Sequence, residues 1–266
     1  KQYREADRPE DVGKCLLTIA NHFIMLEDYE NALPLYKEAY QLALEHKSIE
    51  LQQVSGIMLI KYLCGARYYS ESLEYYNKIK PEIAFNPSMQ NEVVKSYMEL
   101  NKPDSARIYL AARLLSERGD KIVLNCMMAE TYITEELEDS AFVFLDRPMK
   151  SYKERAKNYQ KKGKEPILPN CFLSPCYSFA DLLWKKGKIQ QASQYYMIVE
   201  PLMKERVKTP VRMELQIKAL TNFSSFCRET KQYEKALDLL ARRDSVLQTY
   251  LEFKAKNDKK NYAERL

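Results

Sequence analysis

A short pattern recurs six times along the chain, and it constrains the fold more than any other feature of the sequence. Each copy follows a polar turn and places a small residue about one turn after an aromatic or apolar residue, with another apolar residue four positions later. The small residues are Ala32, Ser72, Ala106, Ala141, Ala192 and Ala236, at spacings of 40, 34, 35, 51 and 44. Repetition at such intervals is typical of a solenoid, in which stacked units share a continuous core.

A second set of positions predicts the structure of each unit. Twelve residues before each small residue lies another small or apolar residue: Ala20, Ile60, Val94, Ala129, Ala180 and Ser224. Three residues further on lies a bulkier one in most units: Phe23, Leu63, Tyr97, Tyr132, Leu183 and Cys227. Two antiparallel helices need small residues where their backbones cross and large residues beside the crossing. No stretch alternates in the manner of a strand, so we predict an all-α fold.

The pattern resembles the tetratricopeptide repeat (TPR), a helical hairpin of 34 residues. The first unit matches at Leu16, Ile19, Ala20, Phe23, Tyr29, Ala32, Tyr36 and Ala39, and the fifth at Phe179, Ala180, Leu183, Gly187, Ile189, Ala192 and Tyr196. Arg113 and Arg243 replace the second small residue in their units, and only two spacings are close to 34, which leaves a related helical hairpin as the alternative. The resemblance covers nearly the whole chain. It implies an α-solenoid of about six TPR-like helix-turn-helix repeats with a long C-terminal helix, in a single superhelical domain over residues 1–266.

The 51-residue spacing marks an insertion with a strong local charge. Residues 147–164 carry eight basic groups and one Glu, a net charge of +7 in a chain whose total is +5. Because the positive charge is local, it argues against a general nucleic-acid-binding surface. We interpret the insertion as a lengthened second helix with a solvated basic end. A docking patch for an acidic partner or an anionic membrane, or for nucleic acid, is the alternative. The Pro-rich residues 165–176 then suggest a break between two sub-blocks.

The sequence contains no pattern that predicts catalysis or metal binding. His22 and His46 lack the spacing of a helical metal site, and the glycine-rich phosphate-binding and nucleophile motifs are absent. We therefore predict no enzymatic activity, no metal and no cofactor. The six cysteines fit a reduced, packed role, although Cys171 and Cys176 flank a Pro-containing turn and could pair in an oxidising compartment. No run of 18 apolar residues is present, so no membrane span is expected.

The inward positions of the first helices are the candidate binding surface. They include Asn21, Lys61, Asn91, Lys95, Glu130, Tyr177, Asp181, Trp184 and Arg228. In the TPR family a two-carboxylate clamp grips a chaperone's C-terminal peptide. Here only Asn21 matches it, while Leu17, Met58, Ser88 and Glu92 occupy the other four positions, which argues against that partner. Lys residues in the N-terminal half and acidic residues in the C-terminal half suit a protein or peptide segment with apolar anchors and opposite charges at its ends. The alternative is a merely solvated inner face.

The C-terminal residues suggest a biological context. Residues 233–266 read as one helix without Gly or Pro, apolar at first and strongly polar later, and we expect residues 250–266 to form a connector helix. Degenerate, Tyr-rich repeats with such an exiting helix resemble bacterial membrane-bound regulators, in which an extracytoplasmic TPR domain precedes a membrane span. This resemblance implies a sensor or interaction domain on the periplasmic side, with a tether beyond Leu266 and no direct contact with nucleic acid. A freestanding cytoplasmic scaffold or peptide-sensing protein is the alternative, and an assembly factor for outer-membrane or secretion machinery is a third.

Overall fold

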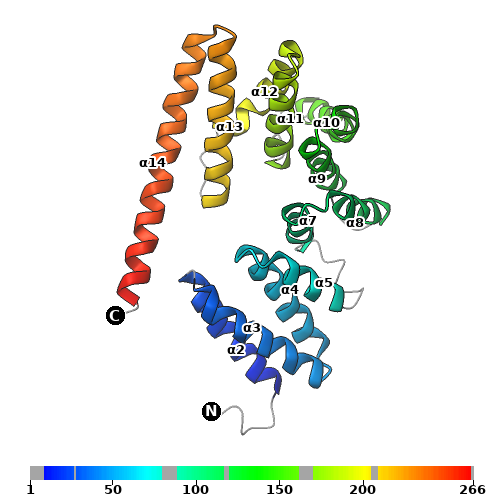
Figure 1. Cartoon of the computed structure of the whole chain (residues 1–266), viewed down its shortest axis with the longest axis vertical. Coiled ribbons are helices and arrows are strands. Elements are labelled where there is room, and N and C mark those ends of the chain that lie inside the picture. Colours follow the sequence, from blue (N-terminus) through cyan, green and yellow to red (C-terminus); the bar gives the residue numbers. More distant parts are fainter. Residues whose placement is uncertain are drawn as a thin grey trace. The chain divides into compact units, whose positions relative to one another are not determined.

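A computed structural model describes residues 9–26, 28–79, 89–116, 120–161, 170–204 and 209–264. Within them the chain forms twelve α-helices and one short 3-10 helix, and these residues contain no strand (Figure 1). The predicted all-α fold is confirmed. The chain divides into two compact units, one of Lys1–Arg118 with Lys260–Leu266 and the other of Gly119–Lys259. This boundary differs from the break suggested near residues 165–176, of which residues 165–169 lie outside the described part. A single domain over residues 1–266 stays a prediction.

The first unit contains three helical hairpins, and each corresponds to one predicted repeat. They are α2 (Pro9–Met25) with α3 (Tyr29–Glu45), α4 (Ile49–Gly65) with α5 (Tyr69–Lys78), and α7 (Gln90–Glu99) with α8 (Pro103–Leu115). The first helices also contact one another in chain order, α2 with α4 and α4 with α7. Contact between neighbouring hairpins is what makes such an array a solenoid.

The second unit repeats this arrangement with three further hairpins. They are α9 (Lys121–Thr134) with α10 (Glu138–Lys161), α11 (Leu173–Lys185) with α12 (Ile189–Lys204), and α13 (Pro210–Glu229) with α14 (Tyr233–Glu264). The 3-10 helix η2 (Asn170–Phe172) leads directly into α11. The first helices again contact one another, α9 with α11 and α11 with α13. The core of this unit includes a stack of Tyr196 on Phe223, whose ring centroids are 4.6 Å apart.

The predicted crossing positions are buried in every hairpin. All six small residues of the second helices are buried, and so are the six residues that lie twelve positions before them. In the second hairpin the contact is polar, since the Ser72 hydroxyl donates a hydrogen bond to the Ile60 carbonyl at 3.1 Å. The register drawn from the sequence is therefore confirmed.

The turn inside each hairpin is closed by an equivalent backbone hydrogen bond, at the same position of each repeat. A backbone N–H bonds to the carbonyl five residues earlier, and the accepting residues are Phe23, Leu63, Tyr97, Tyr132, Leu183 and Cys227. This bond defines the Schellman motif, which ends a helix through one residue in the left-handed conformation. Five described turns have such a residue: Arg67, Asn101, Glu136, Gly187 and Lys231, with φ between 55° and 75°. Only one of the five is glycine, so the other four turns carry backbone strain.

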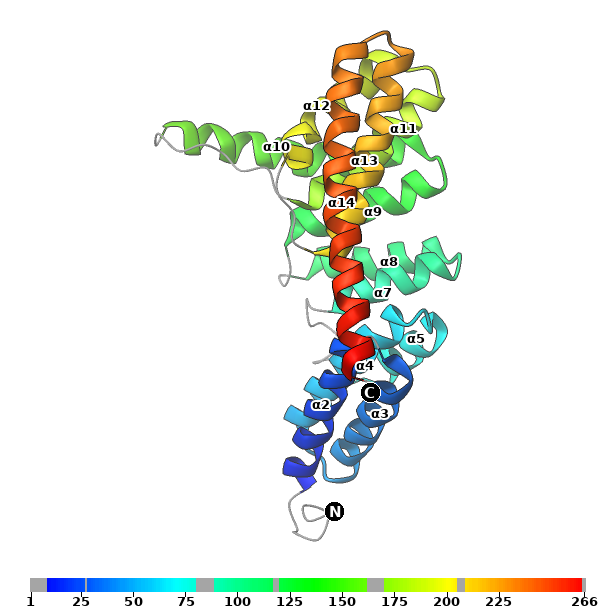
Figure 2. The ribbon, with the colours of Figure 1, turned by 90° about the vertical axis from the view of Figure 1, so that its left-hand side faces the viewer.

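Residues 147–161 of the insertion continue a helix, as the sequence predicted, and residues 162–164 lie outside the described part. Helix α10 has 24 residues, whereas the equivalent helix α12 has 16. Figure 2 shows the second half of α10 extending away from the other helices of its unit. The Asp146 carboxylate pairs with Lys150 at 2.7 Å along this helix. Lys157 and Lys161 belong to the last turns of α10, near a helix C-terminus, where the helix dipole favours positive charge.

Helix α14 is the longest helix of the described residues. It has 32 residues, whereas its partner α13 has 20. The two helices are joined by a hydrogen bond from the Tyr250 hydroxyl to the Glu214 carboxylate. Leu251 is 55% exposed and Leu247 is 36% exposed, whereas Phe253 is partly buried. A helix folded back as a solenoid cap would bury all three. The connector role of residues 250–266 stays a prediction.

Candidate functional site

In the first unit, the predicted site residues Asn21, Lys61, Asn91 and Lys95 are all exposed on first helices. Lys61 and Lys95 lie near the Glu92 carboxyl, on which both exert a favourable charge interaction. Burial raises the pKa of Glu92, and the two lysines oppose that increase. One Glu92 oxygen, Oε2, is buried, and no described residue donates a hydrogen bond to it. The structure therefore groups Lys61 and Lys95 around a carboxyl that sequence reasoning had not included.

Asn21 is held in place by a tyrosine from the second helix of its hairpin. The Tyr36 hydroxyl donates a hydrogen bond to the Asn21 side-chain oxygen at 2.6 Å. The Tyr36 ring stacks on Tyr62 with centroids 5.1 Å apart. Since its ring is buried, Tyr36 keeps its proton, and burial raises its pKa. Asn21 thus presents its amide NH₂ group while its oxygen is occupied.

In the second unit, Asp181 has the equivalent arrangement with a carboxylate. The Tyr196 hydroxyl donates to one of its oxygens and the Asn222 amide donates to the other. Burial raises the pKa of Asp181, and these two hydrogen bonds oppose the increase by stabilising the charged form. Lys185 and Lys218 add a weaker favourable charge interaction. Asp181 is therefore largely satisfied within the unit.

The two tyrosine contacts obey one rule that sequence reasoning missed. Asn21 and Asp181 each directly follow the crossing residue of a first helix. Tyr36 and Tyr196 each lie four positions after the crossing residue of the paired second helix. Both hydrogen bonds consequently join residues 15 apart. The sequence contains this signal, but Tyr36 and Tyr196 match large TPR positions, which by themselves predict only packing. They do pack, and they also orient the polar residues of the candidate surface.

Glu130 and Tyr177 are close neighbours in the second unit, but they differ in exposure. Tyr177 is 3% exposed and belongs to the core, which corrects its predicted role as an accessible aromatic anchor. Glu130 is partly exposed, and its charge acts on Tyr177. Burial raises the pKa of Glu130, and a hydrogen bond with Ser174 opposes the increase. Tyr177 and the Glu130 carboxyl therefore lie close together, on α11 and α9.

Trp184 and Arg228 occupy two different environments. Trp184 is partly buried and meets Phe226 edge to face, with ring centroids 5.7 Å apart. Arg228 is exposed and lines a hollow of about 390 Å³ between α13 and α14. The apolar wall of this hollow includes Tyr233, 60% exposed, and Leu237, 67% exposed. The lining of this hollow includes Arg228 but not Trp184, Asp181 or Glu130.

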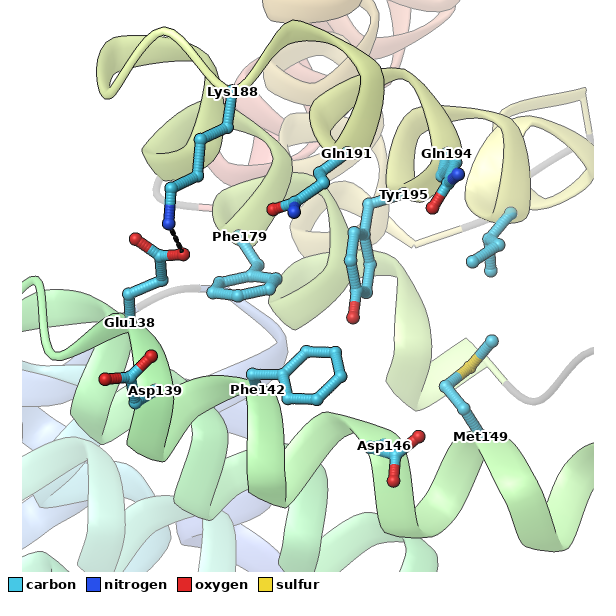
Figure 3. A pocket seen from close by; sticks show the side chains of 11 residues that line it. Glu138, Asp139, Phe142, Asp146, Met149, Phe179, Lys188, Gln191, Gln194 and Tyr195 are labelled. Atoms are coloured by element: carbon cyan, nitrogen blue, oxygen red, sulfur yellow. Dashed lines mark hydrogen bonds and ion pairs between the residues drawn. The ribbon is translucent and has the colours of Figure 1, made fainter.

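A further pocket lies between α10 and α12, as Figure 3 shows. It has a volume of about 500 Å³. Phe142, 48% exposed, and Tyr195 lie on opposite helices, and the Tyr195 ring meets Phe179 edge to face at 5.0 Å. Glu138, at one end, forms an ion pair with Lys188. The sequence showed these aromatic residues only as part of the repeating pattern, without a sign that they border a pocket.

The described residues include both histidines and all six cysteines of the chain. No three His, Cys, Asp or Glu side chains among them are grouped in a way that could hold a metal ion. No described helix is long and apolar enough to cross a membrane.

No protein-family model matches the sequence, and no curated protein matches it. The solved structure of PilF from Pseudomonas aeruginosa is similar, with a TM-score of 0.55 over 93% of this chain and 99% of that chain. The fold is a TPR-type α-solenoid. Because the sequence identity is 13%, this likeness concerns the fold. It agrees with the predicted repeats, and solenoids of this kind commonly present extended surfaces for protein contact.

Proposed function

We propose that this chain is a non-catalytic protein- or peptide-interaction module that serves as the sensor or interaction domain of a bacterial membrane-tethered regulator. In this proposal it lies on the periplasmic side and binds its partner along the first helices. The observation that carries the binding proposal is the environment of Glu130. Glu130 is a partly exposed residue of a first helix, and burial of its carboxyl raises the pKa of that group. A cation brought by a ligand would stabilise the charged form of this group.

The second unit therefore favours a basic ligand segment. Asp181 is already bonded by Tyr196 and Asn222, so it contributes negative potential more than a free hydrogen-bond acceptor. Trp184 offers a partly exposed ring on the same helix, α11. A segment with a Lys or Arg for Glu130 and an apolar side chain for Trp184 matches both groups. Aromatic residues often dominate the binding energy of such contacts.

Selection from a phage-displayed library of random peptides tests this proposal. We expect selected peptides to combine a basic and an apolar residue. Trp184 is the only tryptophan, so its fluorescence should report their binding. Glu130→Gln should weaken the selected peptides about tenfold, in line with the loss of a charge-assisted contact. Trp184→Ala should weaken them by a similar or larger factor, measured by fluorescence polarisation of labelled peptides.

Glu234→Gln is the matched control, because Glu234 is an exposed carboxylate at the start of α14. It should leave the affinity unchanged. Selected peptides that bind the Glu130→Gln and Glu234→Gln variants equally well would contradict the proposed surface.

The tether is tested separately by the coding sequence after Leu266. A run of about 20 apolar residues there would support a membrane-tethered regulator. A stop codon, or a second domain without such a run, would count against the tether and favour the freestanding scaffold.

A further inference from the structure

The hollow of about 390 Å³ between α13 and α14 lies at positions that the preceding hairpin, α11 with α12, uses to hold a helix. The register relates the two hairpins by an offset of 44 residues, which is the spacing of Ala192 and Ala236. This offset pairs three residues that line the hollow with three residues of the fifth hairpin: Ser225 with Asp181, Arg228 with Trp184, and Leu240 with Tyr196.

In the fifth hairpin, α13 contacts all three of these residues. The Asn222 amide donates a hydrogen bond to the Asp181 carboxylate. The rings of Phe226 and Phe223 lie against Trp184 and the tyrosine, with centroid separations of 5.7 Å and 4.6 Å respectively. The tyrosine at the third position is fully buried in this contact. The place between the two helices of the fifth hairpin is therefore filled by the first helix of the next hairpin.

The equivalent place in the sixth hairpin is accessible. Arg228 is exposed there, and Ser225 and Leu240 are partly exposed. Tyr233 and Leu237 also line the hollow, and both are among the exposed large apolar residues of the chain. Exposed apolar side chains grouped along a hollow mark a site of protein contact. A groove between two helices, with apolar side chains along it, suits the apolar face of an incoming helix.

Two arginines make this hollow basic, one from each helix. Arg228 and Arg243 line it, and no Asp or Glu is among the described residues that do so. Arg243 donates two hydrogen bonds to the Asp244 carboxylate, at 2.9 and 2.6 Å. These use two of the five guanidinium donors, and an ion pair at such an exposed carboxylate is weak. Both arginines can therefore donate to carboxylates that a partner brings.

We propose that the hollow between α13 and α14 binds an acidic amphipathic helix of a partner protein. The helix takes the place that α13 has in the fifth hairpin. Like α13, it presents two apolar side chains three positions apart, here toward Leu237 and Leu240. Asp or Glu residues beside them pair with Arg228 and Arg243. The site is separate from the surface of α9 and α11 proposed above and takes a partner of opposite charge, so either proposal can fail without the other.

The probes for the test are stapled helical peptides with a fluorescent label. Each has two phenylalanines three positions apart and two glutamates, whose places around the helix vary within the series. We expect at least one of them to bind the whole chain in fluorescence polarisation. Replacing its glutamates by lysines, or its phenylalanines by alanines, should weaken binding about tenfold or more.

Variants of the protein locate the contact. Leu237→Asp and Arg228→Glu should each weaken the acidic peptide about tenfold or more, and both side chains are exposed, so the fold should persist in circular dichroism. The lysine peptide should bind Arg228→Glu more tightly than it binds the unmodified chain, which a loss of structure would not produce. Met197→Asp and Lys121→Glu are the matched controls, because they make the same charge changes at exposed positions of the second unit outside the hollow. They should leave the affinity unchanged.

Three results would overturn the proposal. One is that no acidic peptide of the series binds the whole chain, or that the lysine peptides bind it equally well. Another is equal affinity of Leu237→Asp and Met197→Asp for the acidic peptide. The third comes from sedimentation: a chain that dimerises, and that Leu237→Asp converts to a monomer, would assign the hollow to a second copy of this chain instead.

Discussion

The left-handed turn residues give a sharp test of the repeat geometry, because one turn has glycine and the equivalent turns do not. Gly187 has φ 75°, and a Cβ atom added there would meet no atom within 4 Å. The cost of Gly187→Ala is therefore conformational. The left-handed conformation destabilises the folded state by roughly 1–2 kcal/mol when the residue is not glycine. Alanine also lowers the conformational entropy of the unfolded chain, which stabilises the folded state by roughly 0.4–1 kcal/mol. We expect a net destabilisation of about 1 kcal/mol.

The reverse change is available at an equivalent turn of the same unit. Lys231 is exposed and has φ 61°. By the same reasoning, Lys231→Gly should stabilise the second unit by about 0.5–1 kcal/mol. Urea unfolding followed by Trp184 fluorescence measures both free energies, and the slope with urea should stay unchanged.

Gly65→Ala is the matched control for the alanine substitution. Gly65 ends helix α4, and an added Cβ would make ordinary contact with the Tyr29 side chain at 3.4 Å. Since alanine is the better helix former, Gly65→Ala should be neutral or stabilising, as measured by circular dichroism. Unchanged stability in Gly187→Ala, or destabilisation by Lys231→Gly, would refute the strain assigned to these turns.

Two further predictions concern the packing and the tail. Ala192 is fully buried at a helix crossing, so Ala192→Arg should destabilise the fold by several kcal/mol through overpacking and the burial of a charge. Gln190→Arg is the control, because Gln190 lies on the exposed face of α12, and it should leave thermal unfolding unchanged. Equal melting temperatures for these two variants would disprove the crossing register. Hydrogen exchange should show weak protection after Phe253 in the isolated monomer, since few apolar side chains follow it. Strong protection of residues 254–264 would favour the solenoid cap and weaken the case for a connector.

The candidate surface was only partly predictable from the sequence. Most of its polar residues follow directly from the register, since Asn21, Lys61, Lys95, Glu130 and Asp181 each occupy the position after a crossing residue. Their partners did not follow, because a large aromatic position in a repeat predicts packing without saying whether a hydroxyl reaches a neighbour. Tyr177 shows the opposite failure: its position predicted an inward face, yet it is buried at 3% exposure. Periodicity gives the direction of a side chain, whereas exposure depends on how closely the next hairpin approaches.

The sequence alone determined the helical hairpins of this protein, because small residues at crossings and large residues beside them are local requirements of helix packing. It also determined the lengthened α10, since an insertion with helical composition can extend a second helix without disturbing a crossing. Only the tertiary structure decided which distant groups meet. Arg113, which departs from the repeat pattern, is fully buried near Tyr76 and Tyr109. Such contacts depend on how neighbouring hairpins are stacked, and the spacing of residues within one hairpin contains no information about that stacking.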